Sequence, residues 1–254
     1  LIVNELRRLL IDRRRLEDCT KSDSLILLNQ NEYHYITRVL RLRNDDSLNV
    51  IDGLGSLWEA RVANEKSIKL TSTFDKPLKE ETPPEIKVCL AVVLPKNGFE
   101  EVLRMSCEIG VDILQPLLSD YQVSKSKSDK RLRRWTSILH EAVEQSERLW
   151  APKLCKTLHF KDWLGSRSLK SAYSIATTRR NESTGLRNWM EDLKINKEIE
   201  EIWVLIGPEG GWSKEEVSLA LKAGCEGVKL GANILRTPTA AIVASQFMAS
   251  FRDK

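Results

Sequence analysis

From residue 87 onward, short apolar runs alternate with amphipathic segments, and this alternation restricts the folds that the chain can adopt. The run KVCLAVVL (87–94) is almost continuously apolar, as strands are when helices cover both faces of their sheet. The segment 98–110 follows it with apolar residues on one helical stripe and stops at Gly110. Further strands are expected at 111–117, 171–177, 202–207 and 227–230, and further helices at 131–149, 213–224 and from 237 onward. This order predicts an α/β domain with a largely parallel sheet.

The N-terminal part of the chain has a different pattern, with several short strand-like runs and one helical segment. The runs SLNVIDG (47–53) and LWEARVA (57–63) surround Asp52-Gly53, which is a hairpin signal, and SIKLTST (67–73) is a third run. A helix is expected at about 32–40. Several short strands and one helix in so few residues predict a small β-barrel.

A charged, proline-bearing stretch, FDKPLKEETPPEIK (74–87), separates the two patterns. It is poor in core residues and therefore reads as a linker. The chain has 254 residues, which is enough for two modest domains. We expect an N-terminal domain at 1–74, a linker at 75–86 and a C-terminal domain at 87–254.

The composition argues against a membrane protein, a disulfide-rich protein and a metalloprotein. No stretch approaches 18 consecutive apolar residues, and no signal-peptide pattern opens the chain. The cysteines are far apart without a CxxC motif and the histidines are scattered, so we expect reduced thiols and no metal site. These residues are Cys19, Cys89, Cys107, Cys155, Cys225, His34, His140 and His159. The expected location is the cytoplasm.

Positive charge is concentrated in two places, although the formal net charge is only +4. Residues 1–43 carry nine basic and six acidic side chains, and residues 122–135 carry six basic side chains against one aspartate. Such clusters suit contacts with phosphate groups. A solvated surface loop is the alternative for either cluster.

The stretch LIGPEGGW (205–212) runs from an expected strand into a turn that contains three glycines and a proline. Ser213 and Glu216 have the spacing of a capping box, so a helix is expected to begin there. The glycines then lie between a strand and a helix, where open α/β sheets bind ligands. The pattern fits neither a phosphate loop nor a dinucleotide fingerprint, and Pro208 lacks the N–H that an anion site would use. A loop that approaches a flat or neutral ligand is indicated, with a purely structural turn as the alternative.

A second loop of this kind, LGANILRTPTAAIVA (230–244), follows the next strand. Thr237 is expected to be the N-cap of a further helix, with Pro238 in its first turn. Because both loops leave the carboxyl ends of parallel strands, they should lie at the same edge of the sheet.

At these two loops the sequence resembles the RsmE-like methyltransferases of the SPOUT superfamily. Residues 205–211 and 230–240 match the family patterns LLIGPEGG and LG..ILRTETA. The resemblance continues over essentially the whole chain, through blocks at 7–11, 34–53, 94–123 and 141–154. One departure matters: Pro238 stands where the family usually has Glu, so no role of that carboxylate carries over.

The family transfers a methyl group from S-adenosylmethionine to N3 of a uridine in the 16S RNA of the small ribosomal subunit. The resemblance implies an N-terminal PUA-like RNA-binding β-barrel and a C-terminal SPOUT domain with a deep trefoil knot, whose knotted loops hold the cofactor. It also implies a homodimer with active sites at the subunit interface, and 16S ribosomal RNA or the small subunit as partner. Knots are so rare that periodicity alone would not predict one.

The resemblance places the cofactor against the main chain of both loops, where side chains would obstruct it. The implied cofactor-binding residues are Leu205, Ile206, Gly207, Pro208, Glu209, Gly210, Gly211, Leu230, Gly231, Ile234, Leu235, Arg236 and Thr237. Arg236 is the candidate for stabilising negative charge on the uracil carbonyls as N3 loses its proton; the alternative is an arginine that braces its own loop. Glu209 is a second catalytic candidate, as proton acceptor or as a contact to the positive end of the cofactor, with capping of the following turn as the alternative.

For RNA binding we expect phosphate contacts from both domains. The candidates are Arg7, Arg8, Arg38, Arg41, Lys96, Gln145 and Arg148, together with the basic run 125–134. Glu141, Gln145 and Arg148 recur at helical spacing, and a solvated helix face is the other interpretation of that pattern. Trp212, beside the glycine loop, suits either packing or base stacking.

Two other functions remain open from the sequence. A related enzyme could act on another RNA, such as transfer RNA. An RNA-binding assembly factor that has lost catalysis is the second possibility, for which Pro238 is the one indication.

Overall fold

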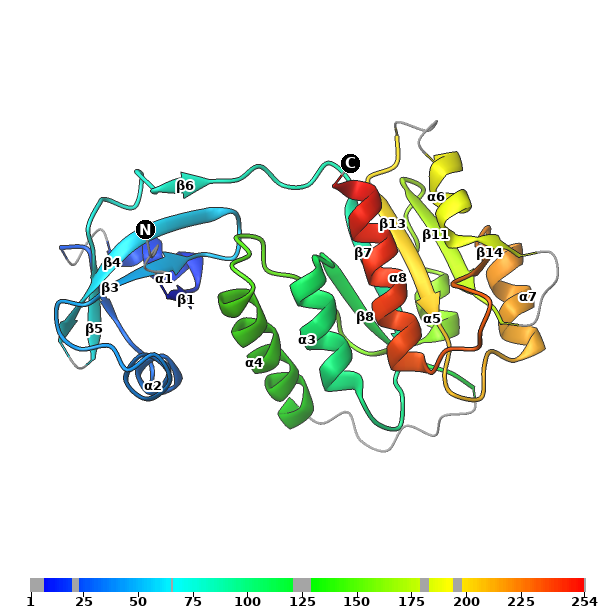
Figure 1. Ribbon diagram of the computed structural model, residues 1–254, viewed down its shortest axis with the longest axis horizontal. Coiled ribbons are helices and arrows are strands. Elements are labelled where there is room, and N and C mark those ends of the chain that lie inside the picture. The colour runs from blue at the N-terminus through cyan, green and yellow to red at the C-terminus, as the bar shows by residue number, and fades with distance from the viewer. Residues whose placement is uncertain are drawn as a thin grey trace. The chain divides into compact units, whose positions relative to one another are not determined.

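Two sheets organise the chain, one in each of two units (Figure 1). The structure is a computed structural model that describes residues 7–19, 23–64, 66–120, 129–178, 183–193 and 198–253. The first unit comprises Leu1–Pro83 and His140–Ala151, and the second comprises Pro84–Leu139 and Pro152–Lys254. No helix among the described residues is long and apolar enough to cross a membrane.

The first unit is built on a six-stranded, mostly antiparallel sheet in the order β1-β3-β4-β5-β2, with β6 paired to β4. Its strands are β1 (Arg8–Leu10), β2 (Leu25–Leu27), β3 (Ser47–Ile51), β4 (Ser56–Asn64), β5 (Ser67–Leu70) and β6 (Lys79–Glu80). Alternate residues of these strands, such as Leu48, Val50 and Ala60, join Ile26 and Ile68 in one buried core. The helices are α1 (Arg13–Asp18), α2 (Gln30–His34) and the π-helical turn η2 (Tyr35–Val39) that continues α2.

The expected strands and the helix at 32–40 are confirmed by β3, β4, β5, α2 and η2. Helix α1 was missed because its sequence, RRRLED, contains a single buried residue, Leu16, and so has no apolar period. The segment expected to be a linker contains β6, where Lys79 and Glu80 pair with Leu57 and Ser56 of β4.

The segment 140–151 belongs to the first unit through several hydrogen bonds. The N–H of Leu10 donates to Oε1 of Glu144 (2.9 Å), and the N–H of Ala151 donates to the carbonyl of Gly53 (2.9 Å). At Gly55, φ is +103°, and a Cβ would lie 2.5 Å from the carbonyl oxygen of Glu81. The same Cβ would lie 2.7 Å from Cζ2 of Trp150, so a glycine is required where the β3–β4 connection meets this segment.

The helix expected at 131–149 is shorter at its end, and α4 spans Asp129–Gln145. Glu147 adopts a left-handed backbone conformation with φ of +61°, which no helix continues through. The expectation that Glu141, Gln145 and Arg148 share one helical face is therefore wrong, because Arg148 lies beyond the helix.

The second unit contains an eight-stranded parallel sheet in the order β10-β8-β7-β13-β11-β14-β12, with β9 paired to β8. Its strands are β7 (Lys87–Val93), β8 (Ile113–Leu118), β9 (Lys153–Leu154), β10 (Leu158–His159), β11 (Ser171–Ala176), β12 (Thr184–Gly185), β13 (Glu201–Ile206) and β14 (Glu226–Lys229). The expected α/β domain with a parallel sheet is thus confirmed, and β7 is buried from Val88 to Val93.

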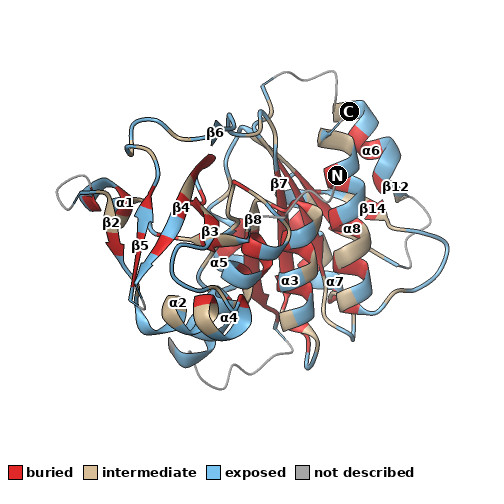
Figure 2. Ribbon diagram, turned by 60° about the vertical axis from the view of Figure 1, so that its left-hand side comes forward, coloured by how far each residue is buried: buried red, intermediate tan, exposed pale blue. Residues whose placement is uncertain are grey.

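Helices cover both faces of this sheet (Figures 1 and 2). The helices are α3 (Phe99–Ile109), the first part of α4, α5 (Phe160–Leu164), α6 (Leu186–Leu193), α7 (Lys214–Lys222) and α8 (Thr237–Arg252). Phe160, Trp163 and Ala220 of α5 and α7 pack with Cys89, Ala91 and other strand residues in one core. Helix α8 packs against α3 and against β7 and β13.

Strands β13 and β14 follow each other in sequence but are not neighbours, because β11 lies between them. The chain that leaves β14 must therefore cross the end of β11 before it reaches α8, which packs against β13. This crossing brings the second glycine-bearing loop back towards the first. The trefoil knot that the resemblance implies stays a prediction.

Glu144 gives the first unit a predicted pH dependence. Burial raises the pKa of Glu144 to about 7, the charges of Glu141 and Glu32 add to this, and hydrogen bonds from Leu10 and Tyr35 oppose it. The pKa of Glu144 is higher in the folded protein than in the unfolded chain. The folded state is therefore not penalised below about pH 4.5, and its unfolding free energy falls as the pH rises through 7. The full loss corresponds to about 3 kcal/mol of unfolding free energy.

We expect Glu144→Gln, which keeps an acceptor for the Leu10 N–H but no charge, to flatten the dependence of melting temperature on pH between 5 and 8. Glu80→Gln, at an exposed position in β6, serves as the control and should melt like the wild type. Parallel melting curves for wild type and Glu144→Gln over this pH range would contradict the assignment.

Candidate functional site

The loop after β13 is a tight turn that leads into α7. The N–H of Gly211 donates to the carbonyl of Pro208 (2.8 Å), and Gly211 has φ of +77°. The predicted capping box is confirmed: Ser213 Oγ accepts from the N–H of Glu216 (3.0 Å), and Glu216 Oε2 accepts from the N–H of Ser213 (2.8 Å). The turn is therefore fixed at both ends, by β13 and by the first turn of α7.

The glycines of the two loops are present for different reasons. A Cβ on Gly207 would lie 2.9 Å from Nε1 of Trp212, so the ring of Trp212 excludes any side chain there. Gly211 needs its positive φ. Gly210 and Gly231 have neither restriction, because no atom of the described residues lies within 4 Å of a Cβ built on either residue. Packing within the chain thus does not explain why these two positions are bare.

Trp212 packs in the structure rather than standing free. Its ring lies 4.9 Å from that of Phe160, centroid to centroid, and borders the core formed by β7, β13, α5 and α7. Within the described residues, its buried Nε1 has no hydrogen-bond partner, and neither has the buried Oγ of Ser119 at the end of β8. The carboxyl edge of the sheet therefore holds two polar atoms that the described residues leave unsatisfied.

A hydrogen bond joins the two glycine-bearing loops. Thr237 is buried, and its Oγ1 donates to the carbonyl of Gly207 (2.9 Å). The expectation that Thr237 is the N-cap is wrong, because α8 begins at Thr237 and Arg236 precedes it as N-cap without a side-chain capping bond. The hydroxyl that sequence reasoning assigned to the cap is instead the link between the loops.

A third loop, 94–98 between β7 and α3, completes the arrangement. The N–H of Lys96 donates to Oε1 of Glu209 (2.8 Å). Gly98 has φ of +85°, and a Cβ there would lie 3.1 Å from Cγ of Pro238. Each of the three loops thus lies against the other two. The sequence contained a signal for this loop, since it follows a fully buried parallel strand and so must leave the same edge.

The remaining cofactor candidates differ in exposure. Leu205 and Ile206 are buried in β13, so their side chains belong to the core and only their main chain faces the loop. Leu230 and Leu235 are half-buried, and Ile234 is 67% exposed. Arg236 is exposed, and in the part of the chain that the structure describes its guanidinium makes no hydrogen bond or ion pair. Bracing of its own loop by a hydrogen bond is thus not seen.

Glu209 is exposed, and its hydrogen bond to the N–H of Lys96 differs from each use that the sequence indicated. The turn that follows it is closed by backbone groups of Pro208 and Gly211. Its carboxylate links the glycine turn to the loop after β7.

The RNA-binding candidates are distributed over both units. In the first unit Arg7, Arg38, Arg41 and Gln145 are exposed and Arg148 is half-buried. Arg8 is engaged by Glu147, with 2.8 Å between Nη2 and Oε2 and a further hydrogen bond to the Glu147 carbonyl. Arg8 therefore holds the segment 140–151 to β1.

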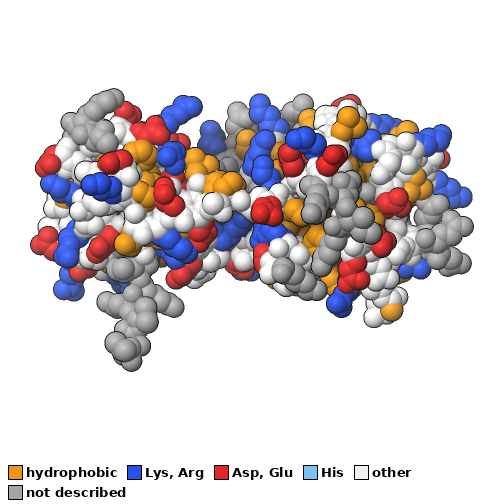
Figure 3. All heavy atoms as spheres, turned by 90° about the horizontal axis from the view of Figure 1, so that it is seen from above, with side chains coloured by type: hydrophobic (Ala, Val, Ile, Leu, Met, Phe, Trp, Pro, Cys, Tyr) orange, Lys and Arg blue, Asp and Glu red, His pale blue; other side chains and the backbone are white. Residues whose placement is uncertain are grey.

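In the second unit, Lys96 is exposed and so are the described members of the basic run, Lys130, Arg131, Arg133 and Arg134. Arg134 pairs with Glu100 at 2.6 Å. Lys125 and Lys127 lie outside the described residues. On the face shown in Figure 3, basic and acidic side chains are interspersed rather than gathered in one patch.

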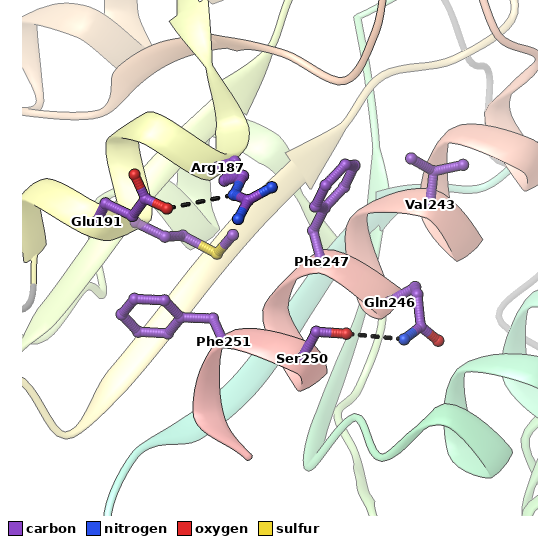
Figure 4. Close-up of a pocket in the computed structure, with 8 residues that line it drawn as sticks. Arg187, Glu191, Val243, Gln246, Phe247, Ser250 and Phe251 are labelled. Carbon is purple, nitrogen blue, oxygen red and sulfur yellow. Dashed lines mark hydrogen bonds and ion pairs between the residues drawn. The ribbon is translucent and has the colours of Figure 1, made fainter. Parts of the chain in front are cut away.

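A pocket of about 320 Å³ lies elsewhere, between α6 and α8 (Figure 4). Met190, Val243, Phe247 and Phe251 supply apolar side chains, and the remaining lining residues are Arg187, Glu191, Gln246 and Ser250. No residue of the three loops lines it. The described residues also contain no group of three or more His, Cys, Asp or Glu side chains that could hold a metal ion.

The two kinds of glycine should respond differently to substitution. We expect Gly207→Ala to lower the unfolding free energy by about 1–3 kcal/mol, because the Trp212 ring has to move. Gly210→Ala is the matched control and should change it by less than about 0.5 kcal/mol. Urea denaturation of both variants measures the difference; equal effects would show that Trp212 does not determine the residue at 207.

Comparisons with known proteins find related methyltransferases over most of the chain. The family model described as an RNA methyltransferase domain matches residues 81–249, and the one described as an RNA methyltransferase PUA domain matches residues 28–74. Ribosomal RNA small subunit methyltransferase E of Synechocystis sp. is 34% identical over 223 residues, covering 87% of this chain and 72% of the relative. The protein of the same name from Rickettsia conorii is 28% identical over 230 residues, covering 88% of each chain.

Solved structures show the same fold. A ribosomal RNA small subunit methyltransferase E from Neisseria gonorrhoeae bound to S-adenosylmethionine has a TM-score of 0.77 at 24% identity, covering 97% of this chain and 98% of that one. A methyltransferase from Legionella pneumophila in complex with S-adenosylmethionine has a TM-score of 0.78 at 25% identity, covering 89% and 91%. The chain belongs to the ribosomal RNA small subunit methyltransferase E family, with an RNA methyltransferase domain preceded by a PUA domain.

Proposed function

We propose that the protein transfers a methyl group from S-adenosylmethionine to N3 of a uridine in the 16S RNA of the small ribosomal subunit. The observation that carries this proposal is the meeting of three loops at the carboxyl edge of the sheet, with bare backbone at Gly210 and Gly231 that the fold does not require. The names of the relatives and the cofactor in two structural neighbours support the substrate class and the donor.

The residues present fit this cofactor. The main chain of 205–211 and 230–237 would hold it, with Gly210 and Gly231 leaving room for close approach and Ile234 offering an exposed apolar side chain. The orphaned Nε1 of Trp212 and Oγ of Ser119 are polar groups at the same sheet edge. When bound, S-adenosylmethionine supplies a methyl group on an activated sulfonium, so the chain itself need only orient the partners and manage one proton.

Orientation is the larger part of that task, since aligning the reactants can lower the reaction barrier by roughly 7–11 kcal/mol relative to free reactants. N3 lies on the Watson–Crick edge of the base, and the target uridine must therefore be unpaired or turned out of its helix to reach the site. Arg236 lies at the end of the second loop, and its guanidinium makes no hydrogen bond or ion pair with a described residue. Its role in the proposal is to stabilise negative charge on the uracil carbonyls as N3 is deprotonated.

The RNA is held through its phosphates by exposed cations of each unit. Arg7, Arg38 and Arg41 serve in the first unit and Lys96 in the second, with Gln145 and Arg148 as further polar contacts. Such contacts fix register rather than read bases. Arg8 contributes less, because its guanidinium is already engaged by Glu147.

The proposal includes a cytoplasmic homodimer, which rests on the family resemblance. The apolar groove between α6 and α8 is a described surface that this chain leaves uncovered.

Light scattering should give twice the mass of the chain, and the mass of a single chain would contradict the dimer.

Mass spectrometry of ribosomal RNA nucleosides tests the function directly. Small-subunit RNA from cells that lack the gene should lose one 3-methyluridine, and the purified protein with S-adenosylmethionine should restore it. Restoration on transfer RNA instead would identify a different RNA substrate. If the protein binds RNA but binds neither S-adenosylmethionine nor S-adenosylhomocysteine, it would be an assembly factor.

Replacement of Arg236 separates catalysis from binding. We expect Arg236→Ala to lower kcat by about 10²–10³-fold, as the loss of one oxyanion donor does, while calorimetry shows unchanged cofactor affinity. Arg104→Ala, an exposed arginine of α3 that pairs with Glu108, is the control and should leave kcat unchanged. Normal turnover by Arg236→Ala with intact cofactor binding would remove Arg236 from catalysis.

A further inference from the structure

The hydrogen bond between Glu209 and Lys96 connects two parts of the proposed site that have different tasks. Glu209 lies in the turn that would hold the cofactor, and Lys96 lies in the loop that would contact RNA. The backbone N–H of Lys96 donates to the Glu209 carboxylate (2.8 Å), and Glu209 is exposed. The bond therefore joins a cofactor loop to an RNA loop across the carboxyl ends of the neighbouring strands β13 and β7.

Loop 94–98 is anchored mainly at its ends. Leu94 donates its N–H to the carbonyl of Leu117 in the sheet (2.9 Å), and the carbonyl of Gly98 accepts from Val102 in the first turn of α3 (3.2 Å). Between these anchors, the hydrogen bond to Glu209 is the one that holds the middle of the loop among the described residues. An exposed hydrogen bond of this kind opens readily, so the position of Lys96 depends on how well the Glu209 turn is ordered.

We propose that Glu209 is a positioning residue that couples cofactor binding to RNA binding through Lys96; this rests on the proposed function. The turn is fixed at its ends, and a cofactor packed against the backbone of 207–211 would also hold its exposed middle and keep the Glu209 carboxylate on the Lys96 N–H. The lysine ammonium is then already placed when RNA arrives, and the RNA does not have to order the loop itself. By linkage, RNA must strengthen cofactor binding by the same factor.

The two remaining contacts between the loops make this role specific to Glu209. Thr237 joins the second loop to Gly207, and Pro238 packs against Gly98, so the fold of the edge survives without the carboxylate. What the coupling needs from residue 209 is a hydrogen-bond acceptor. Glutamine supplies one and alanine does not, whereas neither can accept a proton as a general base.

The test measures coupling rather than activity. Calorimetry gives the affinity for S-adenosylhomocysteine with and without an unmethylated 16S RNA transcript, and filter binding gives the affinity for that transcript with and without S-adenosylhomocysteine. We expect each ligand to tighten the other at least about 5-fold in the wild type. Glu209→Gln should keep this factor, and Glu209→Ala should reduce it to about 1 while each ligand still binds alone.

Two further variants sharpen the result. Glu215→Ala removes an exposed carboxylate from the first turn of α7 and should keep the full coupling. Lys96→Ala keeps the backbone N–H and removes the side-chain ammonium. It should therefore weaken RNA binding and abolish the coupling between the two ligands. Combining it with Glu209→Ala should cause no further loss of coupling. Melting curves confirm that each variant is folded.

Full coupling in Glu209→Ala, its absence from the wild type, or an equal loss in Glu209→Gln and Glu209→Ala would overturn the inference. The last result would assign the role to the charge of Glu209 instead of its acceptor. Failure of the wild type to bind S-adenosylhomocysteine at all would instead refute the proposed function, and the two failures are therefore distinguishable.

Discussion

The hydrogen bond from Thr237 to the carbonyl of Gly207 is the interaction on which the proposed site depends. Strands β13 and β14 are separated by β11, so their loops would not meet without a return of the chain towards β13. Helix α8 makes that return by packing on β7 and β13, and Thr237, its first residue, fixes the second loop to the first. The bond therefore joins the two bare segments as two sides of the proposed site.

Bare backbone at Gly210 and Gly231 faces the place where the proposed ligand would lie, beside the exposed side chains of Ile234 and Arg236. Trp212 takes up the space beside Gly207 and supports the turn from within the core, while Gly210 and Gly231 face open space. Pro238 shows how a departure from the family pattern is accommodated: it occupies the first turn of α8 and packs against Gly98, a residue whose positive φ suits the loop there. The edge of the sheet thus keeps its shape without the missing carboxylate.

The parallel sheet, the helix at 99–109 and the capping box at Ser213 were predictable, since they depend on local periodicity and spacing. The partners of Thr237 and Glu209 were not, because each bonds to a residue more than 25 positions away. The position of Arg148 was also wrong, because a left-handed Glu147 leaves no signature in the sequence. Sequence therefore indicated which segments form the proposed site, whereas the contacts that join these segments required the fold.

The proposed function requires the bare backbone of the two glycine-bearing loops to surround the cofactor. A crystal structure of the protein with S-adenosylhomocysteine tests it most directly. We expect the ligand between residues 207–211 and 230–237, in contact with the main chain of Gly210 and Gly231. A ligand bound away from these loops, for instance in the groove between α6 and α8, would contradict it.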